Sequence, residues 1–508
     1  MSDTDRTRGR DLRIAIIGTG PGGLCMGIRL KGAGFERFEI LEKADGVGGT
    51  WYHNRYPGCA CDVPSHLYSF SFELKRDWSR PYAPQPEILA YLEHCAETYG
   101  LLPHCRFGDA VRRARWDEAA AEWTLETASG RVLSADVVVS AVGMFNEIAV
   151  PDIPGRDTFA GTCFHSARWR RDHDLSDETV GVIGSAASAV QLVPQIVKQA
   201  GRVHLFQRTA NWVAPKEDDP YTERQLERFR SDPAFALAVR RKIFESLDGP
   251  RAFERVRSEM VAACHANLAR VGDPQVRARL VPDHPWGAKR PLFSNDYYPA
   301  FNRPDLELVT DPIERITPGG IVTVDGRERR LDTLILATGF ATTRFLSAID
   351  VTGRGGLSIA DAWSGGAQAY KGVTTAGFPN LFMLYGPNTN ADSIITMLEY
   401  QVDHALRQVQ RIAREGLAWI DVKPGPMAEY NAEFQRELEA IEMWQAGCSD
   451  YYRAPSGRIV TQWPRSMPAL QEALSGLDED AYEVAHHAPA RRTRSTTGVG
   501  DRSRNRLG

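Results

Sequence analysis

The sequence contains no CxxC motif, and its 508 residues include only 8 cysteines, which are scattered along the chain. A disulfide framework and a thiolate zinc site are therefore not indicated, and we expect no metal site. The nearest pair, Cys59 and Cys61, has the spacing CxC. Two interpretations of this pair stay open: a redox-active dithiol, or two buried thiols in a packed turn, which the spacing favours.

Long apolar stretches and a strong excess of either charge are also missing. The first residues, MSDTDRTRGRD, are polar where a signal peptide needs an apolar segment, and no apolar run approaches the roughly 20 residues of a membrane-spanning helix. The formal net charge is −4 and the pI is about 6.3, so the chain has no basic field of the kind that nucleic-acid binding needs. We therefore expect a cytoplasmic enzyme with no membrane span and no nucleic-acid partner.

A glycine-rich turn near the N-terminus predicts a first dinucleotide site. An apolar run over residues 12–17 ends at Gly18, a helical pattern covers residues 22–30, and a second apolar run covers residues 38–41. This order of strand, turn, helix and strand is the context that GxGxxG requires. Glu42, 24 residues after Gly18, can accept hydrogen bonds from ribose hydroxyls and would repel a 2′-phosphate, so the unit suits FAD or NAD. The residues expected to bind the dinucleotide are Gly18, Gly20, Pro21, Gly23 and Glu42.

The same order recurs in the middle of the chain and predicts a second dinucleotide site. A strand pattern over residues 179–183 precedes Gly184, a helix is expected over residues 187–199, and a strand over residues 203–206. Only the first glycine of the motif is kept. Arg208 follows the second strand where the first unit has its acid, and a guanidinium there can pair with a 2′-phosphate, which favours NADPH. A solvated surface arginine is the alternative. The residues expected to bind this cofactor are Gly184, Ser185, Ala186, Ser188, Arg208 and Thr209.

The chain is long enough for several domains, and 43% of its residues are hydrophobic. Residues 215–289 are rich in charged residues and helix formers without a strand pattern, which indicates a helical insertion. The predicted fold class is α/β, with two Rossmann-like dinucleotide-binding domains and this insertion. The expected division is a disordered N-terminus (1–10), an FAD domain (11–145 and 331–477), an NADPH domain (146–214 and 290–330), the insertion (215–289) and a disordered tail (478–508).

Two further segments resemble the motifs of a known family. Residues 48–62, GGTWYHNRYPGCACD, match the GGxW…YPGxxxD motif of the Baeyer–Villiger monooxygenases at every defined position. Residues 159–169, FAGTCFHSARW, resemble the FxGxxxHxxxW fingerprint of the same family. Related N-hydroxylating enzymes usually carry Tyr or Phe where this chain has Trp169. Arg170 is a departure, because the family typically has Pro or Asp there.

The resemblance extends from about residue 12 to residue 470. It includes GAKR at residues 287–290, DTLILATGF at 332–340 and FPNLFMLYGPN at 378–388. Near the C-terminus, Cys448, Tyr451 and Trp463 echo further family elements, and Arg465 stands where glycine is usual. By resemblance, further cofactor contacts are expected at Gly49, Thr50, Trp51, Tyr56, Asp62, Lys289, Thr338, Gly339 and Asn388.

In this family NADPH reduces FAD, and O2 adds to the flavin at C4a to give a peroxide that attacks a ketone, so that an ester or lactone forms. The resemblance implies that Arg290 stabilises the anionic peroxide and the tetrahedral adduct, and that Asp62 holds Arg290 in place. It assigns His165 and Trp169 to the linker between the two dinucleotide domains, where they couple domain rotation to catalysis. From the residues alone, Asp62 as a turn acceptor and Arg290 as a surface charge stay open.

Two other functions remain as alternatives. A related flavin monooxygenase that hydroxylates an amine or oxidises a sulfide needs only the protonated peroxide, and Trp169 together with Asp62 and Arg290 favours the ketone reaction. A flavin-binding partner protein without oxygenase chemistry is the second alternative, and the intact set of motifs argues against it. The sequence thus predicts an FAD-containing, NADPH-dependent monooxygenase whose substrates are O2 and a small organic molecule, a ketone by resemblance.

Overall fold

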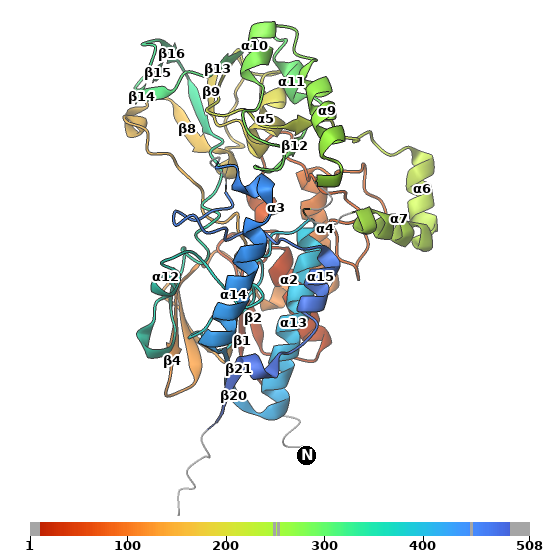
Figure 1. The fold of residues 1–508 in the computed structure, drawn as a ribbon, viewed down its shortest axis with the longest axis vertical. Helices are drawn as coiled ribbons and strands as arrows, with labels where there is room; N and C mark the ends of the chain where they lie inside the picture. Colours follow the sequence, from red (N-terminus) through yellow and green to blue (C-terminus); the bar gives the residue numbers. More distant parts are fainter. Residues whose placement is uncertain (1–10, 247–249, 251–253, 448–450, 488–508) are drawn as a thin grey trace, which may run out of the picture.

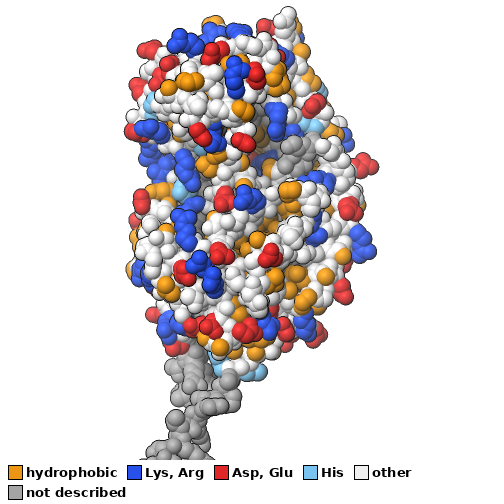
Figure 2. All heavy atoms as spheres, turned by 90° about the vertical axis from the view of Figure 1, so that its left-hand side faces the viewer, with side chains coloured by type: hydrophobic (Ala, Val, Ile, Leu, Met, Phe, Trp, Pro, Cys, Tyr) orange, Lys and Arg blue, Asp and Glu red, His pale blue; other side chains and the backbone are white. Residues whose placement is uncertain are grey.

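The computed structural model describes residues 11–246, 250, 254–447 and 451–487, which form two lobes, each built around a sheet of parallel strands (Figure 1). This arrangement confirms the α/β class. The predictions for residues 1–10, residues 488–508 and Cys448 lie outside the described residues. On the face drawn in Figure 2, acidic, basic and hydrophobic side chains are interspersed over the lower lobe. Among the described residues, no helix is both long and apolar enough to cross a membrane.

The lower lobe contains a five-stranded parallel sheet in the order β19-β7-β1-β2-β3. Its strands are β1 (Ile14–Ile17), β2 (Phe38–Leu41), β3 (Cys105–Arg106), β7 (Val137–Ser140) and β19 (Leu381–Met383). The sequences IAII and VVVS of two central strands are entirely buried, as expected when helices cover both faces of a parallel sheet. Helix α2 (Pro21–Gly32), which confirms the helix predicted over residues 22–30, packs against α13 (Ile394–Glu415).

Smaller elements complete the lower lobe. A four-stranded sheet has the order β18-β4-β5-β6. Its strands are β4 (Val111–Asp117), β5 (Glu122–Thr127), β6 (Val132–Ala135) and β18 (Asp350–Thr352). The remaining helices of this lobe are α3 (Thr50–His53), α4 (Gln85–Thr98), α12 (Ile359–Ala362), α14 (Pro424–Glu439) and α15 (Met467–Ala473). The 3-10 helices of the described residues, in both lobes, are η1 (Leu102–His104), η2 (Arg156–Thr158), η3 (Ser166–Arg168), η4 (Arg354–Gly356), η5 (Glu442–Gln445) and η6 (Glu479–Ala481).

The upper lobe contains the second parallel sheet, in the order β13-β10-β9-β17-β8. Its strands are β8 (Thr162–His165), β9 (Thr179–Ile183), β10 (Arg202–Phe206), β13 (Leu306–Val309) and β17 (Thr333–Leu336). Helix α5 (Ala187–Ile196) follows β9. A separate antiparallel meander consists of β14 (Ile313–Thr317), β15 (Gly320–Thr323) and β16 (Glu328–Arg330). Because β17 pairs with both β8 and β9, the predicted return to the first domain at residue 331 is wrong. The strand TLIL is apolar in either sheet, so its composition carried no information about which sheet it joins.

Helices dominate the stretch between the second sheet's β10 and β13. They are α6 (Glu223–Ser231), α7 (Pro233–Ser246), α9 (Arg257–Leu268), α10 (Pro274–Arg279) and α11 (Tyr297–Ala300), and two short strands, β11 (Val213–Ala214) and β12 (Leu292–Phe293), pair beside them. In Figure 1, α6 and α7 project to one side of the molecule. Arg240 of α7 is buried and donates hydrogen bonds to the carbonyl oxygens of His66, Leu67 and Ser69 at 2.9–3.0 Å. The insertion is therefore tied to the lower lobe through backbone carbonyls.

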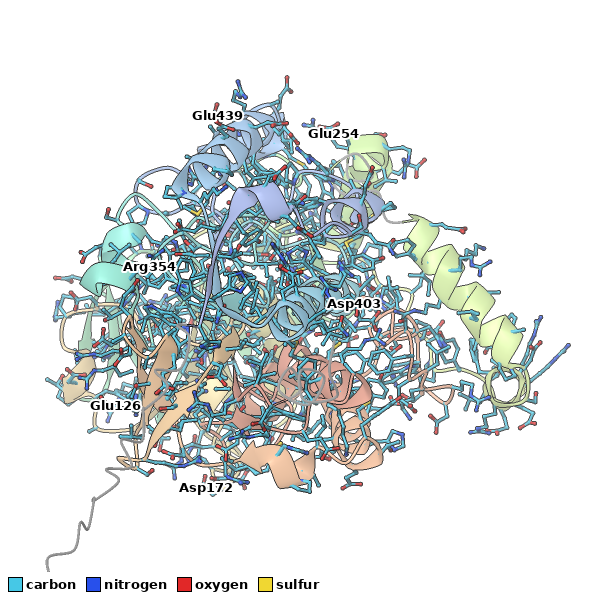
Figure 3. All side chains as sticks on the ribbon, turned by 90° about the horizontal axis from the view of Figure 1, so that it is seen from below. Glu126, Asp172, Glu254, Arg354, Asp403 and Glu439 are labelled. Carbon is cyan, nitrogen blue, oxygen red and sulfur yellow. The ribbon has the colours of Figure 1, made fainter. Side chains whose placement is uncertain are left out.

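The C-terminal segment is ordered further than expected. Strand β21 (Tyr482–His486) pairs in an antiparallel manner with β20 (Leu417–Val422). Arg354, which Figure 3 shows beside α12, lies 2.6 Å from Glu483 of β21. The prediction of a disordered tail from residue 478 is therefore wrong for residues 478–487. The segment looks polar because only Tyr482 of the strand is fully buried, while backbone pairing holds the rest.

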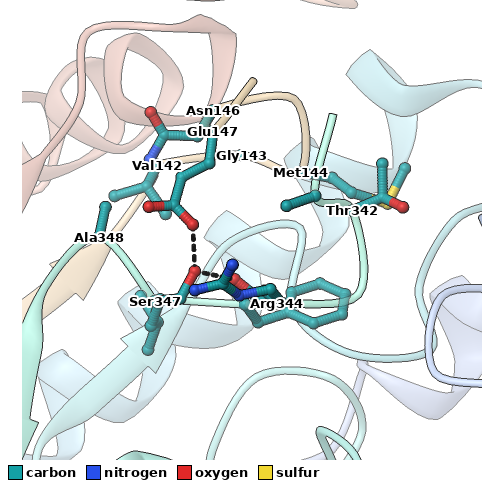
Figure 4. Close-up of a pocket in the computed structure, with 12 residues that line it drawn as sticks. Val142, Gly143, Met144, Asn146, Glu147, Thr342, Arg344, Ser347 and Ala348 are labelled. Atoms are coloured by element: carbon teal, nitrogen blue, oxygen red, sulfur yellow. Dashed lines mark hydrogen bonds between the residues drawn. The ribbon is translucent and has the colours of Figure 1, made fainter. Parts of the chain in front are cut away.

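The chain crosses between the lobes twice, and the two crossings run side by side. Ile148 and Phe340 form an antiparallel bridge. The N–H of Ala149 donates to the carbonyl of Gly339 at 2.8 Å, and the hydroxyl of Thr338 donates back to the carbonyl of Ala149 at 2.5 Å. A small pocket lies between the crossings, where the Ser347 hydroxyl donates a hydrogen bond to Glu147 (Figure 4). The connection between the lobes is thus a two-stranded ribbon.

Candidate active site

The first glycine-rich turn has no room for side chains. Gly18 has a φ of 108°, and a Cβ there would lie 2.6 Å from the carbonyl oxygen of Ala141. A Cβ on Gly23 would lie 1.9 Å from the carbonyl oxygen of Gly18. Gly20 is the N-cap of α2 and Pro21 its first residue, and no side chain among the described residues caps this end. The N–H groups of the first turn therefore face outward, as a diphosphate requires.

Glu42 is buried at the carboxyl end of β2. One carboxylate oxygen accepts hydrogen bonds from the N–H and the hydroxyl of Thr19, both at 2.8 Å, and the other accepts from the N–H of Ala44 at 2.8 Å. A carboxylate can accept about four hydrogen bonds, so a position remains for a ribose hydroxyl. Thr19 was not predicted, because the GxG pattern leaves its middle position undefined.

The predicted residues of the GGxW motif pack directly on this turn. Gly49 has a φ of 54°, and a Cβ on it would lie 2.8 Å from the Cα of Gly20. Thr50 and Trp51 follow in α3, and the indole N–H of Trp51 donates to the hydroxyl of Tyr68 at 3.0 Å. Two glycine segments thus approach each other to form one cradle, and side chains would fill it.

The second turn repeats this geometry in the upper lobe. Gly184 has a φ of 106°, and a Cβ on it would lie 2.4 Å from the carbonyl oxygen of Ala337. The hydroxyl of Ser185 donates to the carbonyl of Thr209 at 3.0 Å. Ala186 is the N-cap of α5 and Ser188 lies in its first turn, and no described side chain caps this helix either. The alanines that replace two glycines are therefore compatible with an anion-binding turn.

Two cationic side chains predicted for the 2′-phosphate are available. Arg208 is exposed two residues after the end of β10, and Lys289 is half-buried beside Arg290. Neither side chain forms a hydrogen bond or an ion pair with another residue in the described part of the chain, so both are free to bind an anion.

Asp62 and Arg290 form a bidentate ion pair between segments 228 positions apart. The Nε of Arg290 donates to Asp62 Oδ2 at 3.0 Å, and Nη2 donates to Oδ1 at 2.8 Å and to Oδ2 at 2.7 Å. The negative charge of Asp62, followed by the Tyr451 hydroxyl, holds the pKa of the Arg290 guanidinium well above its usual range. The Arg290 side chain is 36% exposed, so the ion pair remains accessible to a small molecule.

Several groups around this ion pair were not predicted. The ammonium of Lys216 donates to the carbonyl of Cys61 at 3.1 Å. Tyr385 is buried with a φ of 61°, and its hydroxyl donates to Asn390 at 2.7 Å. Burial raises the pKa of Tyr385 well above its usual range, and Tyr451 adds to the effect. Left-handed backbone at a residue other than glycine often accompanies functional sites, but the sequence carries no signal for it here.

Cys59 and Cys61 are both buried and neither forms a disulfide. Burial raises the pKa of Cys59 to about 12, and burial together with Asp62 raises the pKa of Cys61 even further. Both side chains are therefore protonated thiols at neutral pH, which makes them poor nucleophiles. The interpretation as two buried thiols is confirmed.

His165 and Trp169 lie where β8 ends and the chain turns. Nδ1 of His165 accepts a hydrogen bond from the N–H of Ala167 at 3.1 Å, and burial lowers the pKa of His165 to about 4. Its buried Nε2 has no partner among the described residues. Trp169 packs edge-on against Phe164, with ring centroids 5.2 Å apart. His165 is therefore neutral at pH 7, and the observed contacts of both residues are with the backbone and the core.

The remaining predicted residues border the lobe connection and β19. Gly339 lies in the ribbon with a φ of 80°. Asn388 is buried with a φ of 58°, and its Nδ2 donates to the carbonyls of Ile459 and Gln462. Its Oδ1 is buried without a partner among the described residues, which suits a ligand that brings a hydrogen-bond donor.

Two glycine turns, one followed by an acid and the other by a base, define a flavoprotein oxidoreductase that binds two dinucleotides. Residues 15–245 match the family model described as pyridine nucleotide-disulphide oxidoreductase. Over 491 residues the chain is 40% identical to a Baeyer–Villiger monooxygenase of Streptomyces coelicolor, with 94% of each protein covered.

Solved structures give the same result. Cyclohexanone monooxygenase from Rhodococcus sp. Phi1 bound to NADP+ matches with a TM-score of 0.84 and 31% identity, over 94% of this chain and 99% of that one. A complex of OTEMO with FAD and NADP matches with a TM-score of 0.84 and 27% identity, over the same shares. The chain belongs to the Baeyer–Villiger monooxygenases, and its cofactors are FAD and NADPH. The uncapped helix ends and crowded turns fit these two dinucleotides.

Proposed function

We propose that the Asp62–Arg290 pair is the centre at which this chain inserts an oxygen atom into a ketone, with FAD at the first glycine turn and NADPH at the second. The observation that carries the proposal is the bidentate ion pair, which is partly open to solvent. An arginine fixed at two of its nitrogens presents its remaining N–H groups in one defined direction.

Bound FAD, once reduced by NADPH, would supply electrons to O2. The chain's own residues prepare this chemistry in two ways. Asp62 binds Nε and Nη2 of Arg290 and does not occupy Nη1, which can donate a hydrogen bond to an oxygen that gains negative charge. Arg208 and Lys289 supply the positive charge that distinguishes a 2′-phosphate from a ribose hydroxyl.

The proposal is tested with the holoenzyme of Arg290→Ala, with Arg290→Lys as the matched variant that keeps the charge and loses the fork. With NADPH, 18O2 and a panel of ketones, amines and sulfides, the wild type is expected to place one labelled atom in an ester or lactone. Arg290→Ala should still oxidise NADPH, whereas its ester yield should fall by about 100-fold or more, the usual effect of deleting a group that stabilises a developing oxyanion. Ester formation at a rate near wild type in Arg290→Ala would contradict the proposal. If the labelled product were an N-oxide or a sulfoxide and no ester formed, the substrate would be an amine or a sulfide and not a ketone.

A further inference from the structure

Helix α5 of the upper lobe is bonded to the segment that leads to Asp62. The amide oxygen of Gln191, in the second turn of the helix, accepts hydrogen bonds from the hydroxyl of Tyr56 at 3.0 Å and from the N–H of Ala60 at 3.4 Å. The amide nitrogen of Gln191 donates to the carbonyl of Ala60 at 2.9 Å. One side chain thus satisfies both backbone groups of Ala60 and the neighbouring phenol.

The same segment lies in direct contact with the helix backbone. Gly58 has a φ of 81°, and a Cβ on it would lie 2.6 Å from the carbonyl oxygen of Gln191 and 2.9 Å from the Cγ of Gln195. Only glycine fits this approach without displacing the helix. Tyr56 is buried beside the helix, and its hydroxyl lies near Ser188 in the first turn of α5.

Ala60, which the Gln191 amide binds, lies two positions before Asp62 of the ion pair. The carbonyl of Cys61, directly after Ala60, accepts the ammonium of Lys216 at 3.1 Å, and the N–H of Cys61 donates to Ala83 at 3.0 Å. Asp62 follows and pairs with Arg290. The backbone between Ala60 and Asp62 is therefore held on both sides, and its position relative to α5 depends on the Gln191 amide.

We infer that Gln191 is a positioning residue, which sets Asp62, and through it Arg290, relative to the helix whose N-terminus receives NADPH. This inference rests on the roles proposed above for Asp62 and Arg290. The N-terminus of the helix faces the NADPH site, and the helix contacts the Asp62 segment one turn later. It thereby fixes the position of the Asp62–Arg290 pair relative to NADPH. Loss of the amide leaves both cofactor turns intact and removes the hydrogen bonds that fix the Asp62 segment to α5.

The experiment compares Gln191→Met with Gln195→Met in the purified holoenzyme. Methionine keeps the length and apolar packing of glutamine and removes the amide. Gln195 lies one turn further along the same helix beside Gly58, and its amide oxygen accepts a hydrogen bond only from Lys198 among the described residues, so it controls for general damage to α5. The readouts are the rate of flavin reduction by NADPH, the KM for NADPH, and the moles of ester and of hydrogen peroxide formed per mole of NADPH.

For Gln191→Met we expect the rate of flavin reduction and the KM for NADPH to stay within about twofold of wild type. The ester yield per NADPH should fall by roughly threefold or more, with hydrogen peroxide formed in its place, because small displacements of a positioned group cost large factors in rate. Gln195→Met should behave as wild type. An unchanged yield in Gln191→Met, or a parallel fall of reduction and yield in both variants, would overturn the inference.

Tyr56→Phe provides a second test that does not touch α5, in case Gln191→Met fails to fold. It removes one of the hydrogen bonds of the Gln191 amide and should lower the ester yield per mole of NADPH by a smaller factor than Gln191→Met. If this variant also keeps full yield, the inference is wrong. Absence of ester from the wild type itself would count against the proposed function instead, so the two failures are distinguishable.

Discussion

Asp421 predicts a measurable dependence of stability on pH. It is buried in β20, where both of its oxygens lie 3.1 Å from the N–H of Gly377, and it faces Glu483 across the strand pair. Arg354 approaches it only to 3.7 Å, because the same nitrogen binds Glu483 at 2.6 Å. Burial, reinforced by Glu483, raises the pKa of Asp421 from 3.8 to about 7.

The raised pKa of Asp421 determines whether stability rises or falls with pH. The folded protein binds the proton more tightly than the unfolded chain, so the stabilisation is present in full below about pH 4 and is lost as the pH rises through about 7. A shift of about three pH units corresponds to roughly 4 kcal/mol, of which about 2–3 kcal/mol falls between pH 5 and pH 8. Asp421→Asn still accepts a hydrogen bond from Gly377 and has no charge to bury. Its stability relative to wild type should therefore rise by that amount over this interval.

The assay is the melting temperature of both proteins between pH 5 and pH 8. The difference in Tm should widen by about 2–3 °C as the pH rises, because the unfolding entropy of a chain of this length is roughly 1 kcal/mol/K. Glu483→Gln is the control, because it removes the neighbouring charge and should shift the transition of Asp421 to lower pH. Parallel Tm curves for wild type and Asp421→Asn would refute the reasoning, since they would mean that Asp421 does not titrate in this range.

Two further predictions concern the cofactor turns. Gly23→Ala should lower the FAD content of the purified protein, because its Cβ would lie 1.9 Å from the carbonyl oxygen of Gly18, whereas Gly32→Ala at the end of the same helix meets nothing within 4 Å and should keep full FAD absorbance. Full FAD content in Gly23→Ala would show that the turn can open. Arg208→Ala should raise the KM for NADPH by roughly tenfold or more and leave the KM for NADH unchanged, since one charge-assisted pair is lost. Equal increases of the KM values for NADPH and NADH would show that Arg208 does not bind the 2′-phosphate.

The sequence predicts well those parts of the fold whose signals are local. The strands at residues 38–41 and 179–183 have the predicted bounds, because buried parallel strands are short apolar runs flanked by turns. Strand β21 was missed, since backbone pairing with β20 holds it while four of its five side chains stay at least partly exposed. The sheet joined by β17 depends on neighbours more than 100 residues away in sequence, and local composition carries no such information.

The residues of the candidate site also differ in whether a local sequence signal predicts them. Gly18 and Glu42 follow from spacing, because the turn and its acid belong to one βαβ unit. Asp62 and Arg290 are 228 positions apart, so only the resemblance to a family could bring them together before the structure did. Gln191 and Lys216 carry no motif at all. An amide within the otherwise mostly apolar sequence ASAVQLVPQI was the one available signal for Gln191, and Gln195 of the same helix carries it equally.

The two-stranded ribbon between the lobes also determines the order in which the protein can be completed during synthesis. Strand β7 ends at Ser140, and its parallel partner β19 begins at Leu381, so the entire upper lobe is translated between them. At roughly 5–20 residues per second, the ribosome needs on the order of 10–50 s to pass from one strand to the other. During that time the lower sheet exposes an open edge at β7, and the upper lobe, although later in the sequence, is the first whose sheet has all its strands.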